Sequence, residues 1–244
     1  MLKSRLTALV GAAGIFLATL TTPLLAGEYI SIGGGVSGGA TVISVTGEEK
    51  MLQSGDINKA TETGEAPLGS AYYELSFFDG WFEDRWGTSG FTIGYEHIWG
   101  EAKIKKLREN IMDVYGTGNT AVNVGNNYME ASFENLRTMY IETPGITPLG
   151  FYLRYGTSEM DIKTHEEMAT GASYGDTSTD AETYGFGFKK AGGGFLIKTE
   201  FNYTDWDSVT LSSTHSGPGS TGGADQVSAT PENVSAKFTI GYRF

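Results

Sequence analysis

The last eleven residues of the chain alternate strictly between two kinds of side chain. Every second residue from Val234 to Phe244 is apolar or aromatic, whereas the residues between them are small, polar or basic. Strict alternation is typical of a β-strand, because successive side chains of a strand point to opposite faces. One face of this strand is wholly apolar, and it must meet either a soluble core or lipid.

The same alternation recurs along most of the chain. Six further segments show it, at 28–46, 70–79, 88–101, 149–164, 179–190 and 193–211. The segment 127–142 changes parity: Met129, Ala131 and Phe133 fall on one face, whereas Leu136, Thr138 and Tyr140 fall on the other. A one-residue bulge near 134–135 would reconcile them, because an extra residue reverses every later side chain. The pattern predicts about eight strands.

Long and short connections alternate between these strands. The long ones, 47–69, 102–126, 165–178 and 212–231, are polar, whereas 79–87, 143–148 and 191–192 are shorter. Barrels with an even number of strands show this asymmetry, with long loops outside the cell and short turns in the periplasm. We therefore predict an all-β fold, a transmembrane antiparallel up-and-down β-barrel. The alternative is a secreted, soluble β-sandwich.

Aromatic residues gather where the two membrane interfaces of such a barrel would lie. The group expected on the periplasmic side includes Phe77, Trp81 and Phe244, and the group expected on the outer side includes Trp99 and Trp206.

The N-terminal residues predict export. Lys3 and Arg5 precede a mainly apolar stretch that ends in Leu24-Leu25-Ala26 before Gly27, as in a cleavable signal peptide. We expect residues 1–26 to be the signal peptide and 27–244 to form the outer-membrane barrel domain. A retained membrane anchor is the alternative, although the apolar stretch is short for a span.

Charge and cysteine content exclude several classes of protein. Without Lys3 and Arg5 the chain has 15 basic residues against 29 acidic ones. This balance argues against binding to nucleic acid, whose phosphates require a basic surface. The chain has no cysteine, so disulfides and a lipoprotein anchor are excluded.

Together the signal, the alternating segments and the ending Lys237-Phe238-Thr239-Ile240-Gly241-Tyr242-Arg243-Phe244 resemble the small outer-membrane barrels of the OmpA/OmpX type. The resemblance implies a bacterial outer-membrane location and assembly by the barrel-assembly machinery. That machinery would read the terminal aromatic strand, here Phe238, Ile240, Tyr242 and Phe244. We expect no periplasmic peptidoglycan-binding domain, so a cell-wall anchoring role is not implied.

A barrel of eight strands is just wide enough for its own side chains, so inward charges must pair. The inward faces of the predicted strands carry Glu74, Glu96, Arg154, Lys189, Lys198, Glu200, Lys237 and Arg243. Two interpretations are open. These residues form an internal salt-bridge network that fills the lumen, or they line a narrow ion path.

The segment 102–115 combines basic residues with apolar ones, Ile104, Leu107, Ile111 and Met112, at near-helical spacing. Its basic residues are Lys103, Lys105, Lys106 and Arg108. We expect a short amphipathic helix in the second external loop. Two roles are open for this helix. Its bases contact lipopolysaccharide phosphates, or the helix only caps the barrel mouth.

Catalytic and metal motifs are weak. The histidines are His97, His165 and His215, and Ser208 lies near the last of them, but their spacing defines no nucleophile with its base. Nor do Asp176 and Asp180 have calcium-loop spacing. We expect no enzyme, no metal site and no cofactor.

Three functions remain open. The first is a non-enzymatic surface protein, expected to be a monomer, with a structural or recognition role toward a host, phage or neighbouring cell. The second is a porin-like channel for ions or small hydrophilic solutes. The third is an enzyme that modifies lipid A.

Overall fold

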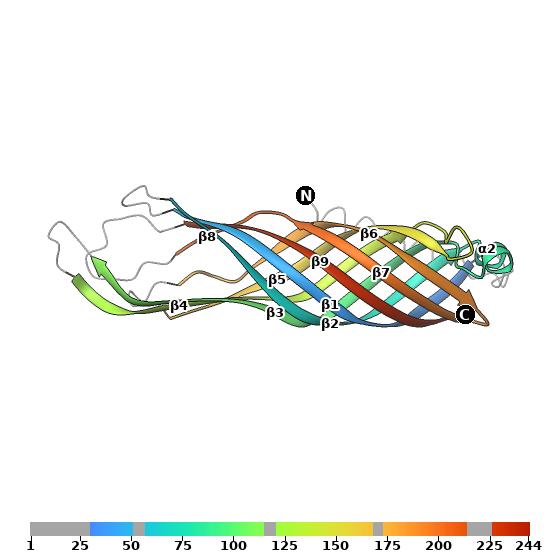
Figure 1. Ribbon diagram of the computed structural model, residues 1–244, viewed down its shortest axis with the longest axis horizontal. Helices are drawn as coiled ribbons and strands as arrows, with labels where there is room; N and C mark the ends of the chain where they lie inside the picture. Colours follow the sequence, from blue (N-terminus) through green and yellow to red (C-terminus); the bar gives the residue numbers. More distant parts are fainter. Residues whose placement is uncertain (1–29, 51–56, 115–120, 168–172, 214–225) are drawn as a thin grey trace, which may run out of the picture.

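The computed structural model describes residues 30–50, 57–114, 121–167, 173–213 and 226–244, without the side chains of Asn58, 105–114 and 121–127. The predicted signal peptide and His215 lie outside these residues. The described elements form one long antiparallel barrel with a short helix at one end (Figure 1). In chain order they are β1 (Ile30–Lys50), β2 (Ile57–Phe77), α2 (Asp79–Trp86), β3 (Phe91–Val114), β4 (Ala121–Glu142), β5 (Phe151–Glu167), β6 (Thr177–Gly192), β7 (Phe195–Trp206), β8 (Val209–Ser212) and β9 (Gln226–Arg243).

The barrel closes between its first and last strands. Neighbouring strands pair in the order β1 to β7 and then β9, and β9 returns to β1 from Gly33↔Arg243 to Lys50↔Gln226. The ring therefore has eight strands, while β8 pairs with β9 alone. This confirms the predicted up-and-down barrel of about eight strands. The closure is also tight at its end, because the backbones of Ile32 and Phe244 exchange two hydrogen bonds of 3.2 and 2.9 Å.

The parity change in 127–142 corresponds to a bulge. Pairing between β4 and β5 shifts register between Glu134 and Arg137, and Asn135 has a left-handed φ of 53°. A matching shift in β3 lies at Gly100, whose φ is 134°. Glu101 pairs with Glu134, so the two irregularities lie side by side in the barrel wall.

Each strand changes character along its length. In the section nearest α2, here called the lower section, most outward side chains are apolar, and most inward ones are polar, charged or tyrosine. It comprises residues 32–42, 69–77, 91–99, 138–142, 151–155, 184–190, 195–203 and 234–244. The remaining strand residues are here called the upper section, and where their side chains are described the pattern is reversed. There Ile43, Ala102, Phe133, Met160 and Trp206 form a buried core inside the barrel.

This reversal corrects the prediction of long external loops. Most of the polar stretches 47–69 and 102–126 are strand, because β1 and β2 pair as far as Lys50↔Ile57 and β3 and β4 as far as Val114↔Ala121. Where side chains are described in these stretches, only every second residue faces the apolar core, so the average composition is that of a loop. Trp206 is also inside the barrel, with only 3% of its surface exposed, and not at the outer interface as predicted.

The lower end is closed by short connections. Residues 143–150 make a compact turn, and Gly193 and Gly194, both with left-handed φ, join β6 to β7. The connection 79–87 contains α2, which lies at the end of the barrel beside the C-terminus (Figure 1). Among the described residues, no helix is long and apolar enough to cross a bilayer.

Candidate functional site

All eight of the predicted lumen charges point into the lower section. Their exposed fractions range from 0% for Lys189 to 6% for Arg154, Lys237 and Arg243. Alternation places them there, because their strand neighbours carry the apolar outer face. Burial of a charge is costly unless it is paired and hydrogen-bonded. The contacts of these residues therefore decide what the lumen can do.

Lys198 is the centre of the first cluster. Its Nζ lies 2.6 Å from Glu74 Oε2 and 3.0 Å from each carboxylate oxygen of Glu142. Lys189 donates to Glu142 Oε2 at 3.4 Å and to the carbonyl oxygen of Gly90 at 3.2 Å. The bonds of Lys198 join β7 to β2 and to β4. Neither of these strands pairs with β7 in the sheet, so the Lys198 side chain crosses the lumen.

Arg154 and Lys237 organise the second cluster. Arg154 donates to Glu200 Oε1 at 2.5 Å and to Glu96 Oε2 at 2.7 Å. Lys237 lies 2.6 Å from Glu96 Oε2 and 3.1 Å from Glu200 Oε1. Two carboxylates thus face two cations from four strands. Ser70 donates to Glu96 and Tyr152 to Glu200, at 2.6 and 2.7 Å.

Arg243 belongs to a third group, at the lower end. It lies 2.5 Å from Asp79 Oδ2 and 3.0 Å from Glu83 Oε2, both in α2. Asp79 also accepts a hydrogen bond from the backbone N–H of Gly90 at 2.6 Å. The last charged residue of the barrel therefore holds the helix across its end.

Several members of these clusters were missed from the sequence. Glu142 was not assigned because the strand 127–142 had no clear parity, although Thr138, Tyr140 and Glu142 share one face beyond the bulge. Asp79 and Glu83 lie in a connection that carried no strand pattern. The excess length of that connection was the one signal available.

A girdle of hydroxyl groups lies above the charges. Thr138 contacts Ser158 at 2.8 Å, Ser158 contacts Thr183 at 2.9 Å and Thr183 contacts Thr204 at 3.0 Å, oxygen to oxygen. These four residues come from four consecutive strands, β4 to β7. The girdle separates the charged clusters from the apolar core of the upper section.

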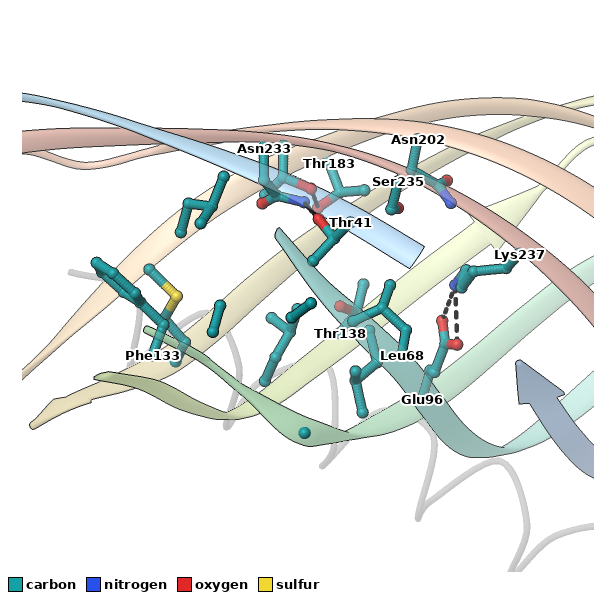
Figure 2. A pocket seen from close by; sticks show the side chains of 18 of the residues that line it. Thr41, Leu68, Glu96, Phe133, Thr138, Thr183, Asn202, Asn233, Ser235 and Lys237 are labelled. Carbon is teal, nitrogen blue, oxygen red and sulfur yellow. Dashed lines mark hydrogen bonds and ion pairs between the residues drawn. The ribbon is translucent and has the colours of Figure 1, made fainter. Parts of the chain in front are cut away.

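A cavity of about 60 Å³ lies at this junction, and Figure 2 shows it with the Glu96–Lys237 pair at one side and Phe133 at the other. Its polar wall includes Thr41, Thr138, Thr183 and Asn233, and its apolar wall includes residues of the upper core.

The predicted basic helix is wrong, because Lys103, Lys105, Lys106 and Arg108 lie in strand β3. A strand has no helical face on which the four bases could gather. Lys103 is exposed and lies 2.8 Å from Glu101 and 3.0 Å from Glu130. Its hydrogen bond holds the pKa of Glu101 below the ordinary value.

The other predicted residues lie on the outer surface. Phe238, Ile240, Tyr242 and Phe244 all point outward from β9 and its end, with 42% to 82% of their surfaces exposed. His97 packs against Trp99 with ring centres 5.9 Å apart. Ser208 is bonded to Thr230 at 2.7 Å. The described contacts bring neither His97 nor Ser208 to a common site.

The outer surface of the lower section defines the class of the protein. Large apolar side chains are exposed around the ring; they include Ile32, Val36, Tyr73, Leu153, Phe186, Phe201, Phe238 and Ile240. A soluble protein rarely exposes so large an apolar surface. In the lower section every strand is paired on both sides, so no sheet edge is left open, and an apolar band around a polar interior suits this section to lipid. The protein is a transmembrane β-barrel of the bacterial outer membrane.

Comparisons with known proteins give similarities of architecture. No protein family and no curated protein sequence matches the chain. The chain is similar to the outer membrane protein OprG from Pseudomonas aeruginosa, with 11% identity over 90% of this chain and 99% of OprG and a TM-score of 0.39. It is also similar to Neisserial surface protein A, NspA, with 9% identity over 81% and 95% of the two chains and a TM-score of 0.28. The attachment invasion locus protein Ail of Yersinia pestis, solved with the heparin analogue sucrose octasulfate, has 12% identity, coverage of 86% and 99%, and a TM-score of 0.23.

Proposed function

We propose that the protein is a closed, non-enzymatic surface protein of the outer membrane that supports recognition outside the cell. The observation that carries this proposal is the crossing of the lumen by ion pairs. Lys198 joins β7 to β2 and β4, while Lys237 joins β9 to β3. Charged side chains paired across the lumen at 2.6 to 3.0 Å leave no open path where they meet. They therefore favour a lumen filled by a salt-bridge network over a lumen that conducts ions.

The upper section supports the recognition role. Its strands continue beyond the apolar band and are held by an internal core, so their ends are presented on a rigid support. The outward side chains just above the band include Glu182, Asp205 and Glu232, all exposed. A partner with basic or neutral groups suits this surface better than a polyanion.

Planar-bilayer recording tests the closed lumen. The refolded protein should give no stable unitary conductance steps. Lys237→Met together with Glu96→Gln removes one crossing pair without adding charge, and it should give measurable leakage. Stable steps from the unaltered protein would contradict the proposal and favour the alternative, a narrow channel for ions or small hydrophilic solutes.

Bead binding tests the recognition role. Cells displaying the protein should bind polylysine-coated beads more than heparin-coated beads, and added salt should weaken the binding. Replacing Glu182, Asp205 and Glu232 by their amides should reduce bead binding. The matched control, Ser178→Ala with Thr230→Ala, changes the same surface without changing its charge. Equal binding by all three proteins would contradict the role of these acids.

Two narrower proposals concern partners. The resemblance to the OmpA/OmpX type and the exposed aromatic end of β9 support recognition by the barrel-assembly machinery. Replacing Phe244 by Ser should then slow assembly in cells but not refolding in detergent.

Contact between lipopolysaccharide and the bases of β3 is the second proposal. Replacing Lys103, Lys105, Lys106 and Arg108 by Gln should reduce co-purified lipopolysaccharide, and unchanged retention would exclude it.

A further inference from the structure

The ring of eight strands is continuous in the lower section but open in the upper one. The ladder between β2 and β3 ends at Gly69↔Trp99. Both strands continue upward, β2 from its start at Ile57 and β3 to its end at Val114, and there each pairs with its other neighbour, β1 or β4. In the described part of the chain, these two strand edges have no ladder partner above Gly69↔Trp99. The space between them is here called the seam.

Two local features stop the ladder at the foot of the seam. Pro67 has no backbone N–H to donate, and Gly100, with a φ of 134°, lies at the register shift of β3. The strands still touch just above, because a Cβ added at Gly64 would lie 3.1 Å from the carbonyl oxygen of Lys103. Beyond that contact the β1–β2 pair and the β3–β4 pair diverge, as Figure 1 shows at the end of the barrel away from α2.

The free edge of β2 can accept another strand. An antiparallel strand directs the N–H and C=O groups of successive residues to alternate sides. Pro67 lies within the β1–β2 ladder and has no hydrogen to donate to β1, so its backbone faces the seam. Thr61 and Thr63 have the same parity and also direct their N–H groups into the seam. A row of free main-chain groups is a template for the addition of a strand.

The two edges carry opposite charge. On β2, residues 57–65 include two acids and one base, whereas on β3 residues 103–110 include four bases and one acid. β1, the neighbour of β2, adds Glu48 and Glu49 against Lys50 at the same end. Each edge therefore attracts an edge of the other kind and repels one of its own kind. The charges favour an interface in which β2 of one copy meets β3 of a second copy.

Two copies in one membrane meet this condition by symmetry. They have the same orientation and the same height, and a two-fold axis along the membrane normal turns their seams toward each other. The axis places β2 of each copy opposite β3 of the other, and the two strands run antiparallel, as they do within one copy. The contact closes on itself, because the same two edges are used twice.

The lipid-facing surface beside the foot of the seam permits close approach. Gly38, Gly69 and Ala71 lie together on the outer faces of β1 and β2, where Gly38 pairs with Gly69. A Cβ added at Gly38 would meet no atom within 4 Å. Trp99 is the ladder partner of Gly69 on β3, and 52% of its surface is exposed. Under the two-fold axis, Trp99 of each copy faces the small residues of the other, and small residues allow close packing within a membrane.

We propose that the protein forms a two-fold dimer in the outer membrane, in which the edge of β2 in each copy pairs with the edge of β3 in the other. Rotation about the membrane normal keeps every residue at its height. Gly64 and Lys103 lie side by side within one copy, so three residues higher Thr61 of one copy lies opposite Lys106 of the other. The dimer replaces the monomer expected from the sequence. The inference rests on the strand edges and not on the recognition role proposed above.

Single cysteines test this pairing, because the chain has none of its own. Two differently tagged copies, one with Thr61→Cys and one with Lys106→Cys, are produced together in the outer membrane and treated with a short bismaleimide. A product that carries both tags joins two copies. It should form at least about fivefold more than the product of two Thr61→Cys copies, because only opposite residues lie within reach.

Ser178→Cys together with Lys106→Cys is the matched control, because Ser178 is exposed on the outer face of β6, away from the seam. This pair should give no product with both tags. Equal yields from the test pair and the control pair, or no product from the test pair in assembled protein, would overturn the proposal.

A second experiment removes the N–H groups of the β2 edge. Thr61→Pro with Thr63→Pro should raise the Kd of the dimer by about tenfold or more, measured by sedimentation equilibrium in nonionic detergent. Thr61→Val with Thr63→Val is the control, because it keeps the N–H groups and loses the same hydroxyl bond to Thr46. Its Kd should be unchanged, and heat-dependent gel mobility checks the folding of both variants.

An equal loss in the proline and valine variants would overturn the role of the edge, and an unaltered protein that stays monomeric at all concentrations would overturn the dimer. The peptide 57–65 separates a second copy from another occupant. If the monomeric protein binds this peptide, the edge belongs to an extended segment of a different protein and the proposal is wrong.

Discussion

Three interior tyrosines occupy space that glycines on other strands leave open. Tyr72, Tyr140 and Tyr152 are at most 3% exposed. A side chain at Gly94 would overlap the ring of Tyr140, and one at Gly241 would overlap the hydroxyl of Tyr72. The rings in turn stack on cations, as Arg154 lies 3.8 Å from the centre of the Tyr140 ring. Close packing of this kind makes the glycines specific to their positions.

Gly94→Val should therefore destabilise the barrel, by about 1–3 kcal/mol for overpacking, although valine favours strands in general. Unfolding of the refolded protein in urea, followed by gel mobility, measures the change. Gly38→Val is the matched control, because Gly38 faces outward with no atom within 4 Å of an added Cβ. Equal loss of stability in both variants would show that the glycines matter for the backbone and not for the tyrosine.

A second residue-scale effect lies outside the membrane, between β5 and the start of β6. Lys163 Nζ is 3.0 Å from Asp176 Oδ2, and the backbone N–H of Thr164 donates to Oδ1 at 3.1 Å. Both bonds favour the ionised form, the lysine most strongly, and they lower the pKa of Asp176 below its ordinary value. A lowered pKa means that the contact is present at neutral pH and is lost as the pH falls through the folded pKa.

Lys163→Met should therefore raise the pKa of Asp176 toward its ordinary value. The rise should be partial, because the Thr164 bond remains. Carboxyl chemical shifts followed through an acid titration measure it. Lys103→Met, which removes a base from another strand pair, should leave the Asp176 titration unchanged. A pKa unaffected by Lys163→Met would show that Thr164 alone holds the carboxylate.

At the scale of elements, α2 depends on the barrel for its existence. An eight-residue helix is marginal in water by itself. It has no side-chain cap at its start, where Phe78 is left-handed, and it ends at Gly87, whose N–H donates to the carbonyl oxygen of Glu83 at 2.8 Å. Arg243 and the backbone of Ala191 bind the helix and its end to the barrel.

Arg243→Met should release α2 without opening the barrel. Asp79 would lose its cation while remaining buried, which is the costly way to break such a pair. Amide exchange in 79–86 should become about tenfold faster or more, while exchange in β5 and β6 stays slow. Arg85→Met is the control, because Arg85 stacks on Trp81 and Trp86 and makes no described bond to the barrel. Unchanged exchange in Arg243→Met would contradict the anchoring role.

The elements also show what a single sequence can and cannot predict. Parity alone located the bulge at Asn135, because the alternation changes phase there. It also located the eight predicted inward charges of the lower section, because each of them lies in a clean alternating run. The same method missed Glu142, whose parity depends on that bulge. It also read 47–69 as a loop, because the inward residues there, such as Ala66, are too small and too sparse to show a core. Pairing across the lumen depends on barrel closure, which no local pattern specifies.

The whole molecule is a barrel whose two sections have opposite polarity along the same strands. On β6, Tyr184, Phe186 and Phe188 point outward, while Glu182 and Ser178 continue the same face above them. The inward face changes in the other direction, from Lys189 through Thr183 to Ala181. The change of outward polarity marks the outer surface of the membrane, and it requires no shift of register on this strand.

This boundary can be mapped by single cysteines, because the chain has none of its own. In intact cells, Ser178→Cys and Glu182→Cys should react fully with a membrane-impermeant maleimide, whereas Phe186→Cys should react only after extraction and unfolding. Ala181→Cys separates this arrangement from a soluble stalk with a water-filled centre. It faces the upper core and is only 5% exposed, so it should stay unreactive although it lies between the two reactive positions. A reactive Ala181→Cys would mean that the upper section is hollow and wet, and a reactive Phe186→Cys would place the membrane elsewhere on the barrel.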